Sequence, residues 1–304
     1  MKPLNILMLS IHGLIRGRDL ELGRDADTGG QTLYVVELAR ALAALPEVAR
    51  VDLMTRRVTD AQLSPDYAQP VEVLGSRARI VRIDAGPEGY LRKEALWDHL
   101  DSFADNALAY LRAEGALPDI VHSHYADAGY VGTRLANLLG VPLVHTGHSL
   151  GRVKRRRLIA SGMKRDAIEA RYNMARRVEA EEQTLGSAAL VIASTDNEVE
   201  AQYGLYDYYQ PEQMRVIPPG TDLQRFMPPD GSESQAPIAA ELARFLRVPD
   251  KPMILALSRP DERKNLGTLL RAYGESAALQ ALANLVVVAG NRDDIRDLDN
   301  GAQG

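Results

Sequence analysis

The sequence of 304 residues contains no cysteine. Disulfide bridges, zinc–thiolate sites, iron–sulfur clusters and thiol nucleophiles are therefore excluded. A basic excess is also missing: the formal net charge is −5, so we expect no whole-surface attraction for nucleic acid or anionic lipid. Internal repeats and low-complexity stretches are absent as well. With 45% hydrophobic and 25% charged residues, the composition is that of an ordinary globular protein.

Long apolar runs are lacking too. The apolar stretch in the N-terminal MKPLNILMLSIHG stops at His12. It is too short for a membrane-spanning helix and has no small-residue cleavage site. We therefore expect a cytoplasmic protein without a membrane partner.

Strand-like apolar runs alternate with helically spaced segments over most of the chain. The first run, 4–11, is almost continuously apolar, which is typical of a parallel strand buried on both faces. This alternation predicts an α/β fold with helices on both faces of a parallel sheet. The expected strands are 4–11, 51–54, 78–83, 119–124, 142–147, 189–194 and 214–219. The expected helices are 31–45, 92–114, 127–139, 165–186 and 195–203.

A segment rich in proline, glycine and serine interrupts this alternation and indicates a domain boundary. We predict a complete first domain over 1–220, a linker over 221–251 and the start of a second α/β domain over 252–304. Within the last range, a strand at 253–258, a helix at 265–276 and a strand at 285–290 form one βαβ unit. A unit of this size is about a third of an ordinary domain, so we expect apolar surface to remain open on it.

The loop GRDADTGGQ (23–31) follows the first predicted strand and opens a helix. Gly29 and Gly30 would let a ligand approach the backbone, and a helix N-terminus offers free N–H groups to an anion. The loop matches neither the dinucleotide fingerprint nor the P-loop. A tight strand–helix turn explains the two glycines equally well.

Four of the six histidines lie in HSHYAD (122–127) and HTGHSLG (145–151), each at a predicted strand end. A metal site is the weaker interpretation, because no carboxylate-rich motif accompanies them. They are either packed, hydrogen-bonded core residues or polar groups that face a substrate hydroxyl or carbonyl.

The basic run GRVKRRR (151–157) follows directly, beside Ser149. It is either a solvated basic face or a cation cluster suited to a phosphate-bearing small molecule. Arg176 and Arg177 in ARRVEAEE either extend that site or pair on the helix surface with Glu179 and Glu181.

LSRPDERKN (257–265) places Arg259 and Lys264 at the end of a strand in the second domain. They either cap helices and face solvent or stabilise a diphosphate leaving group.

Taken together, these segments resemble retaining glycosyltransferases of the GT-B type, and most closely the sucrose-phosphate synthase family within glycosyltransferase family 4. The resemblance runs over nearly the whole chain. It rests on the stretch from SIHGLIRGRD to DADTGGQTLYVVELARAL, on HSHYADAG, HTGHSLGRVKRR, ARRVEAEE, STDNEVEAQY and IPPGTD, and on LSRPDERKN followed by AGNRDD.

The resemblance implies two Rossmann-like domains, the first binding the acceptor and the second the nucleotide sugar. It implies that glucose moves from UDP-glucose to fructose 6-phosphate, giving sucrose 6-phosphate and UDP. No cofactor is required, and Mg²⁺ is at most stimulatory. By position, His148 lies at the reaction centre. The residues carried over for the acceptor and its phosphate are Gly30, Gln31, Lys93, Tyr125, Ser149, Lys154 and Arg177, and those for the nucleotide sugar are Gly29, Gly30, Arg259 and Lys264.

The chain departs from the family in one respect, because it ends before the glutamate-containing E-x7-E segment of the second domain. We expect a truncated chain with impaired transfer, completed by a missing C-terminal part or a partner chain. The alternatives are a non-catalytic sugar-phosphate-binding fragment and a sucrose synthase-like transferase with another acceptor.

Overall fold

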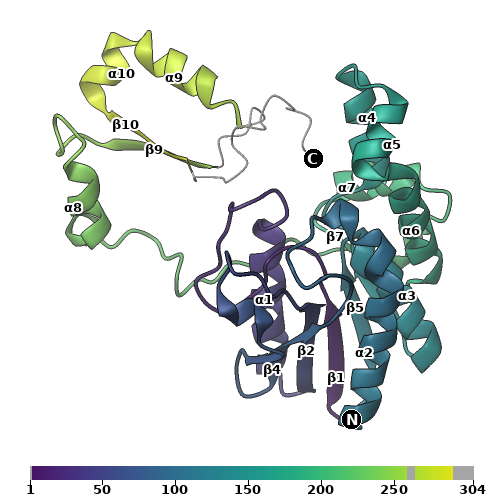
Figure 1. Cartoon of the computed structure of the whole chain (residues 1–304). Coiled ribbons are helices and arrows are strands. Elements are labelled where there is room, and N and C mark those ends of the chain that lie inside the picture. The colour runs from purple at the N-terminus through teal and green to yellow at the C-terminus, as the bar shows by residue number, and fades with distance from the viewer. Residues whose placement is uncertain (1, 259–263, 290–304) are drawn as a thin grey trace. The chain divides into compact units, whose positions relative to one another are not determined.

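The computed structural model describes residues 2–258 and 264–289. Its contacts divide the chain into a first unit, Met1–Pro219, and a second unit that begins at Gly220 (Figure 1). Each unit is described by itself below.

The first unit is built on one sheet with flanking helices, and its strands run in the order β3-β4-β2-β1-β5-β6-β7-β8. Neighbouring strands are parallel, except that β3 pairs antiparallel with β4. The strands are β1 (Leu4–Leu9), β2 (Val48–Arg56), β3 (Val71–Val73), β4 (Ala78–Ile83), β5 (Ile120–His124), β6 (Leu143–Thr146), β7 (Leu190–Ala193) and β8 (Met214–Val216). The expected α/β fold with a parallel sheet is confirmed.

The helices of the first unit are α1 (Gly30–Ala44), α2 (Leu100–Glu114), α3 (Ala126–Leu139), α4 (Gly151–Ala160), α5 (Arg165–Tyr172), α6 (Met174–Ser187) and α7 (Asp196–Ala201). Consecutive residues of β1 are all buried from Ile6 onward, so both faces of the sheet are covered at its centre. On one face, Val36 and Ala39 of α1 pack against Met8 and Leu53 of the sheet.

Two helix predictions were wrong in extent. The predicted helix over 92–114 begins only at Leu100, because Lys93–Ala95 and Trp97–His99 form short 3-10 turns. The backbone N–H of Lys93 donates to Asp27 (2.9 Å) and so ties this segment to the loop between β1 and α1. The predicted helix over 165–186 breaks into α5 and α6 at Asn173, whose φ of 48° lies in the left-handed region that asparagine tolerates.

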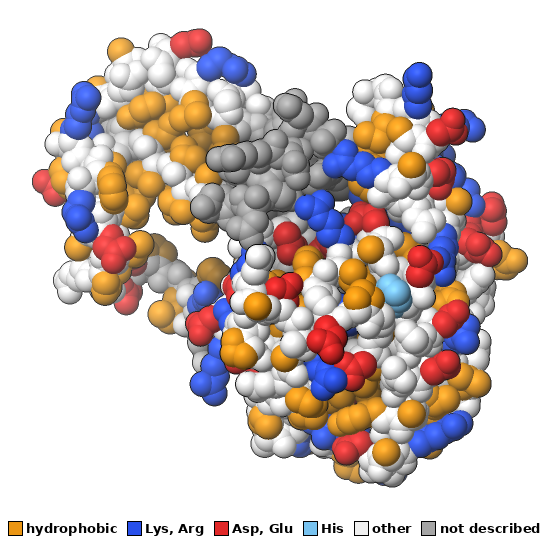
Figure 2. All heavy atoms as spheres, in the orientation of Figure 1, with side chains coloured by type: hydrophobic (Ala, Val, Ile, Leu, Met, Phe, Trp, Pro, Cys, Tyr) orange, Lys and Arg blue, Asp and Glu red, His pale blue; other side chains and the backbone are white. Residues whose placement is uncertain are grey.

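The second unit contains a parallel pair of strands, β9 (Met253–Ser258) and β10 (Asn284–Ala289), with the helices α8 (Pro237–Ala243), α9 (Leu266–Gly274) and α10 (Ala277–Leu282). Alternate residues of β9 are exposed, and Leu257 is 72% exposed. Figure 2 shows hydrophobic side chains gathered on this unit. The described part of the second unit therefore leaves one face of its strand pair open to solvent.

Candidate functional site

Three neighbouring parallel strands of the first unit end at one edge of the sheet, and a polar residue follows each of them. His12 follows β1, Tyr125 follows β5 and His148 follows β6. Tyr125 and His148 have left-handed φ values of 78° and 57°, which are uncommon for residues with a side chain. Because ligands of open parallel sheets bind beyond the carboxyl ends of the strands, this edge is the candidate site.

A small basic pocket opens beside Tyr125. Lys93 lines it from a 3-10 turn, Lys154 from α4 and Arg177 from α6. The other residues that line it are Glu94, Trp97, Asp127 and Tyr172. The structure thus brings together cations from three separate segments, as the resemblance implied.

Lys154 is the cation of this pocket that lacks a carboxylate partner. It is buried, and its Nζ lies 4.0 Å from the ring centroid of Tyr172. Within residues 2–258 and 264–289, no carboxylate oxygen lies within ion-pair distance of it. Burial, and then the charges of Lys93 and Arg177, lower the pKa of Lys154 to about 7. The negative charge of an anion in the pocket would offset both effects and raise the pKa of Lys154.

Arg177 is held in place by three groups. Its Nε donates to Glu181 (2.9 Å), its Nη2 donates to the carbonyl oxygen of Ser149 (2.7 Å), and its guanidinium lies 4.6 Å from the ring centroid of Tyr125. Arg177 therefore pairs with Glu181 one turn away, in a buried position instead of on the helix surface, and it also lines the pocket. Arg176 does neither: it donates to Asp98 (2.7 Å).

Lys93 is paired with Asp27, which accepts from both its backbone N–H and its Nζ. Although burial alone would lower the pKa of Lys93, the Asp27 carboxylate raises it above its usual value. Lys93 therefore carries a permanent positive charge that the Asp27 carboxylate neutralises. Lys154 has no such partner in the described residues.

His12 and Asp127 form a second buried pair, with 2.7 Å between Nδ1 and Oδ2. Burial alone would lower the pKa of His12, and the Asp127 carboxylate raises it overall. The ring of His12 packs edge-on against Tyr125, 4.6 Å between centroids. This pair connects the basic pocket to the end of β1.

His148 lies on the other side of this edge and contacts His124. Nε2 of His148 is 3.0 Å from Nδ1 of His124, and Tyr34 packs edge-on against the His148 ring at 5.1 Å. Burial, and then the neighbouring imidazoles, lower the pKa of His148 to about 3, so the ring is neutral at pH 7. Gln31 adjoins the pair, because its Nε2 donates to the carbonyl oxygen of His124 (3.4 Å).

Gly29 and Gly30 begin α1 next to these residues. A Cβ built on either glycine would meet no atom within 4 Å, so open space lies over the helix N-terminus. The geometry therefore permits a ligand to approach this backbone closely, and that approach remains a prediction.

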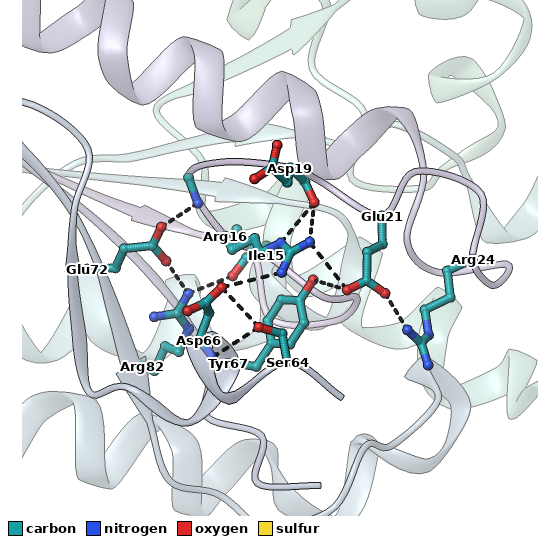
Figure 3. Close-up of polar contacts among 11 residues, drawn as sticks. Ile15, Arg16, Asp19, Glu21, Arg24, Ser64, Asp66, Tyr67, Glu72 and Arg82 are labelled. Atoms are coloured by element: carbon teal, nitrogen blue, oxygen red, sulfur yellow. Dashed lines mark hydrogen bonds and ion pairs between the residues drawn. The ribbon is translucent and has the colours of Figure 1, made fainter. Parts of the chain in front are cut away.

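The long loop between β1 and α1, which carries Asp27, is held by partly buried ion pairs and hydrogen bonds (Figure 3). Glu72 accepts from the N–H of Gly17 (2.7 Å) and pairs with Arg82 (2.5 Å), whose Nη2 also donates to the carbonyl oxygen of Ile15 (2.9 Å). Since Arg82 belongs to β4, the sheet itself holds the loop.

Three further predicted site residues are Ser149, Lys264 and Arg259. Ser149 contacts Arg177 instead of lining the pocket. Lys264 is exposed in the second unit, just before α9. Arg259 lies outside the described residues, as does the AGNRDD motif from residue 290 onward.

The sequence analysis missed two acidic residues of the site, Asp27 and Asp127, whereas it named Glu181 as a surface partner of Arg177. Asp27 and Asp127 lie inside the motifs DADTGGQ and HSHYAD, so a signal was present. Tyr172, which packs on Lys154, gave none, because its place depends on the break between α5 and α6.

The described part of the chain offers neither a metal-binding cluster nor a membrane-spanning helix. No group of three or more histidine or acidic residues among 2–258 and 264–289 could hold a metal ion. No helix in those ranges is long and apolar enough to span a membrane.

Comparison with known proteins places the sequence motifs in context. The family model described as Glycosyltransferase Family 4 matches residues 28–225. A probable sucrose-phosphate synthase 1 of Oryza sativa subsp. indica is 44% identical over an alignment of 361 positions that covers 99% of this chain and 33% of the relative. A sucrose-phosphate synthase of Zea mays is also 44% identical, with 99% and 34% coverage. The chain thus spans about a third of the length of these relatives.

Among solved structures, a sucrose-phosphate synthase from Thermosynechococcus elongatus matches with a TM-score of 0.70 and 28% identity, covering 98% of this chain and 66% of that one. The catalytic domain of starch synthase IV from Arabidopsis thaliana matches with a TM-score of 0.63 at 12% identity, covering 98% of this chain and 70% of that one. The second likeness shows the fold alone, and both agree with the GT-B architecture.

Proposed function

This chain belongs to glycosyltransferase family 4, and from that premise we propose that it carries the acceptor-binding part of a retaining glucosyltransferase of the sucrose-phosphate synthase type. The reaction would join glucose from UDP-glucose to fructose 6-phosphate and release sucrose 6-phosphate and UDP. The relatives that are 44% identical bear the name sucrose-phosphate synthase, which supports this acceptor and product.

The basic pocket is the single observation that carries the proposal. Lys93 and Arg177 have carboxylate partners, whereas Lys154 has none in the described residues. A phosphate dianion would supply the missing negative charge and accept charge-assisted hydrogen bonds from all three cations. An acceptor without phosphate would leave the charge of Lys154 uncompensated, so the pocket favours a phosphorylated sugar.

The rest of the site suits transfer without a protein nucleophile. In the proposed reaction the bond between the glucosyl carbon and the diphosphate oxygen breaks as the acceptor hydroxyl attacks, and the departing phosphate takes the hydroxyl proton. His148, buried and neutral, would contact the sugars at the reaction centre beside Gln31. Rate acceleration would come from positioning and from charge stabilisation of the leaving group.

For the nucleotide sugar, we propose that its phosphates approach the open N-terminus of α1 at Gly29 and Gly30, with Arg259 and Lys264 as further contacts. The open space over both glycines supports the first part. The second part rests on the family resemblance alone. We also propose that the chain acts in the cytoplasm and needs no metal for transfer.

Substitution of Lys154 tests the phosphate role. Titration calorimetry with fructose 6-phosphate should show a loss of about 1.5–3 kcal/mol in Lys154→Ala, because a charge-assisted contact to the phosphate disappears. Binding of fructose should stay nearly unchanged. Arg156→Ala is the matched control: Arg156 is an exposed cation of the same helix, and its removal should alter neither titration. Equal losses for both sugars in Lys154→Ala would contradict the proposal.

Turnover distinguishes an enzyme from a binding protein. Purified protein is incubated with fructose 6-phosphate and labelled UDP-glucose, and sucrose 6-phosphate is measured by chromatography. Tight binding of the acceptor without any transfer would favour a non-catalytic sugar-phosphate-binding role. Transfer to fructose in preference to fructose 6-phosphate would favour a sucrose synthase-like acceptor.

A further inference from the structure

His124 is enclosed among other imidazoles at the end of β5. It is fully buried, and its ring centroid lies 4.1 Å from that of His122 and 5.3 Å from that of His148. Burial, and then these neighbouring rings, keep the pKa of His124 well below 6.5, and burial lowers that of His148 to about 3. At neutral pH each ring therefore carries one N–H and one bare nitrogen.

The contact between His124 and His148 leaves two ways to place those protons. Nδ1 of His124 and Nε2 of His148 are 3.0 Å apart, so one donates and the other accepts. Nε2 of His124 is buried without a hydrogen-bond partner in the part of the chain that the structure describes. If His148 donated, the proton of His124 would lie on Nε2, as a buried N–H without an acceptor.

If His124 donates instead, its buried Nε2 carries only an unpaired acceptor lone pair. Buried N–H groups without a partner are rarer in proteins than under-satisfied acceptors. We therefore infer that His124 is a positioning residue that donates its Nδ1–H to Nε2 of His148 and so fixes the proton of His148 on Nδ1. Within residues 2–258 and 264–289, no group accepts a hydrogen bond from Nδ1 of His148. This N–H is therefore free to donate to a hydroxyl oxygen of a bound sugar.

The backbone around His148 is held by its own hydrogen bonds, independently of the proton on the ring. The N–H of Ser149 donates to the carbonyl oxygen of Gly147 (2.6 Å), which closes a tight turn around His148 at its left-handed φ of 57°. The N–H of Gly147 donates to the hydroxyl of Tyr203 (3.0 Å). With the backbone held, the bond from His124 is what selects the tautomer and orientation of the ring.

Only the identity of the sugar depends on the proposed function; the tautomer does not. Nitrogen-15 NMR of histidine-labelled protein reads the protonation site of each ring directly, and six histidines give a resolvable set of signals. We expect His148 to carry its proton on Nδ1. His124→Asn, whose amide nitrogen can occupy the place of Nδ1, should keep that tautomer. His124→Gln, whose amide nitrogen lies nearer the place of Nε2, should lose it.

His122→Phe is the matched control, since His122 adjoins His124 on the same strand and bonds to Thr146 instead of His148 (2.9 Å). It should leave the His148 signals unchanged, and the His12 signals report in every variant whether the fold is intact. A proton on Nε2 of His148 in the wild-type protein, or an unchanged tautomer in a folded His124→Gln, would overturn the inference.

Kinetics separate this inference from the proposed function. If the protein transfers glucose to fructose 6-phosphate, His124→Gln should lower kcat about a hundredfold, as expected for a misplaced catalytic group, while KM for fructose 6-phosphate stays nearly unchanged. His124→Asn should recover most of kcat. No transfer by a wild-type protein that shows the Nδ1–H tautomer would favour the non-catalytic alternative to the proposed function but support the inference about His124.

Discussion

Lys154 is the residue at which burial and charge conflict most directly in this protein. Its ammonium group is buried beside Lys93 and Arg177, and no carboxylate in the described residues offsets it. The conflict follows from its place on α4, because Leu150 and Leu158, one turn away on either side, are buried and draw the same face inward. An uncompensated cation at this position gives ligand binding a pH dependence.

The affinity for fructose 6-phosphate should fall as pH rises above about 7. The pKa of Lys154 is about 7 in the free protein, and a bound phosphate dianion raises it, so binding takes up a proton in this range. Calorimetry at pH 8 in buffers of different ionisation enthalpy should show proton uptake approaching one per site. Lys154→Arg keeps a permanent charge and should abolish both the uptake and the pH dependence. Uptake that persists in Lys154→Arg would assign the proton to another group.

Lys154 also makes the stability of the unliganded fold depend on pH. The pKa of Lys154 is lowered from its ordinary value of 10.5 to about 7, so the unfolded chain binds more protons between these values. Lys154 therefore destabilises the unliganded fold at neutral pH and below, and this cost is relieved as pH rises from about 7 towards 10.5.

At the scale of elements, α4 and α6 are joined through one buried carboxylate. Both oxygens of Glu181 on α6 lie 3.0 Å from the N–H of Gly151, the first residue of α4. The same carboxylate accepts from Arg177 and from the hydroxyl of Tyr206. A negative charge at a helix N-terminus is stabilising, so Glu181 fixes the helix that carries Lys154.

Removal of this charge should destabilise the first unit. Urea unfolding of Glu181→Gln should show a loss of about 3–5 kcal/mol, because Arg177 is left as an uncompensated buried charge. Glu179→Gln is the control: Glu179 is exposed on the same helix, and its variant should differ by no more than about 0.5 kcal/mol. A loss of similar size in both variants would mean that the buried network around Arg177 contributes nothing particular.

At the scale of the whole molecule, the two units differ in how their sheets are covered. In β1, Met8 and Leu9 have no exposed surface, whereas Leu255 and Leu257 of β9 are 55% and 72% exposed. Strands with few buried apolar contacts open locally at low free energy. The second unit should therefore be the less protected part of the chain.

Hydrogen exchange read by mass spectrometry measures this difference. Relative to their intrinsic rates, amides of β10 (Asn284–Ala289) should exchange on the order of a hundredfold or more faster than those of β1. The amides of α1 serve as a helical reference within the first unit. Equal protection of β10 and β1 would mean that another surface covers the open face of the strand pair in solution.

The sequence by itself determined which segments form the sheet and which residues lie at its edge. The strand-like runs at 78–83 and 253–258 predicted β4 (Ala78–Ile83) and β9 (Met253–Ser258) with the bounds they have. The same pattern placed the segments HSHYAD and HTGHSLG at strand ends, and the family resemblance singled out Tyr125 and His148 within them. These features are local, because each depends on residues close together in the chain.

Only the tertiary structure decided how these residues act together. Lys154 faces inward while Arg156 of the same run is exposed, and this distinction depends on the phase of α4 against α6. Lys93 pairs with Asp27, 66 residues away in sequence. The parallel sheet brings such distant positions to one edge through its strand order, and strand order is set by the packing of the whole domain, which no single segment encodes.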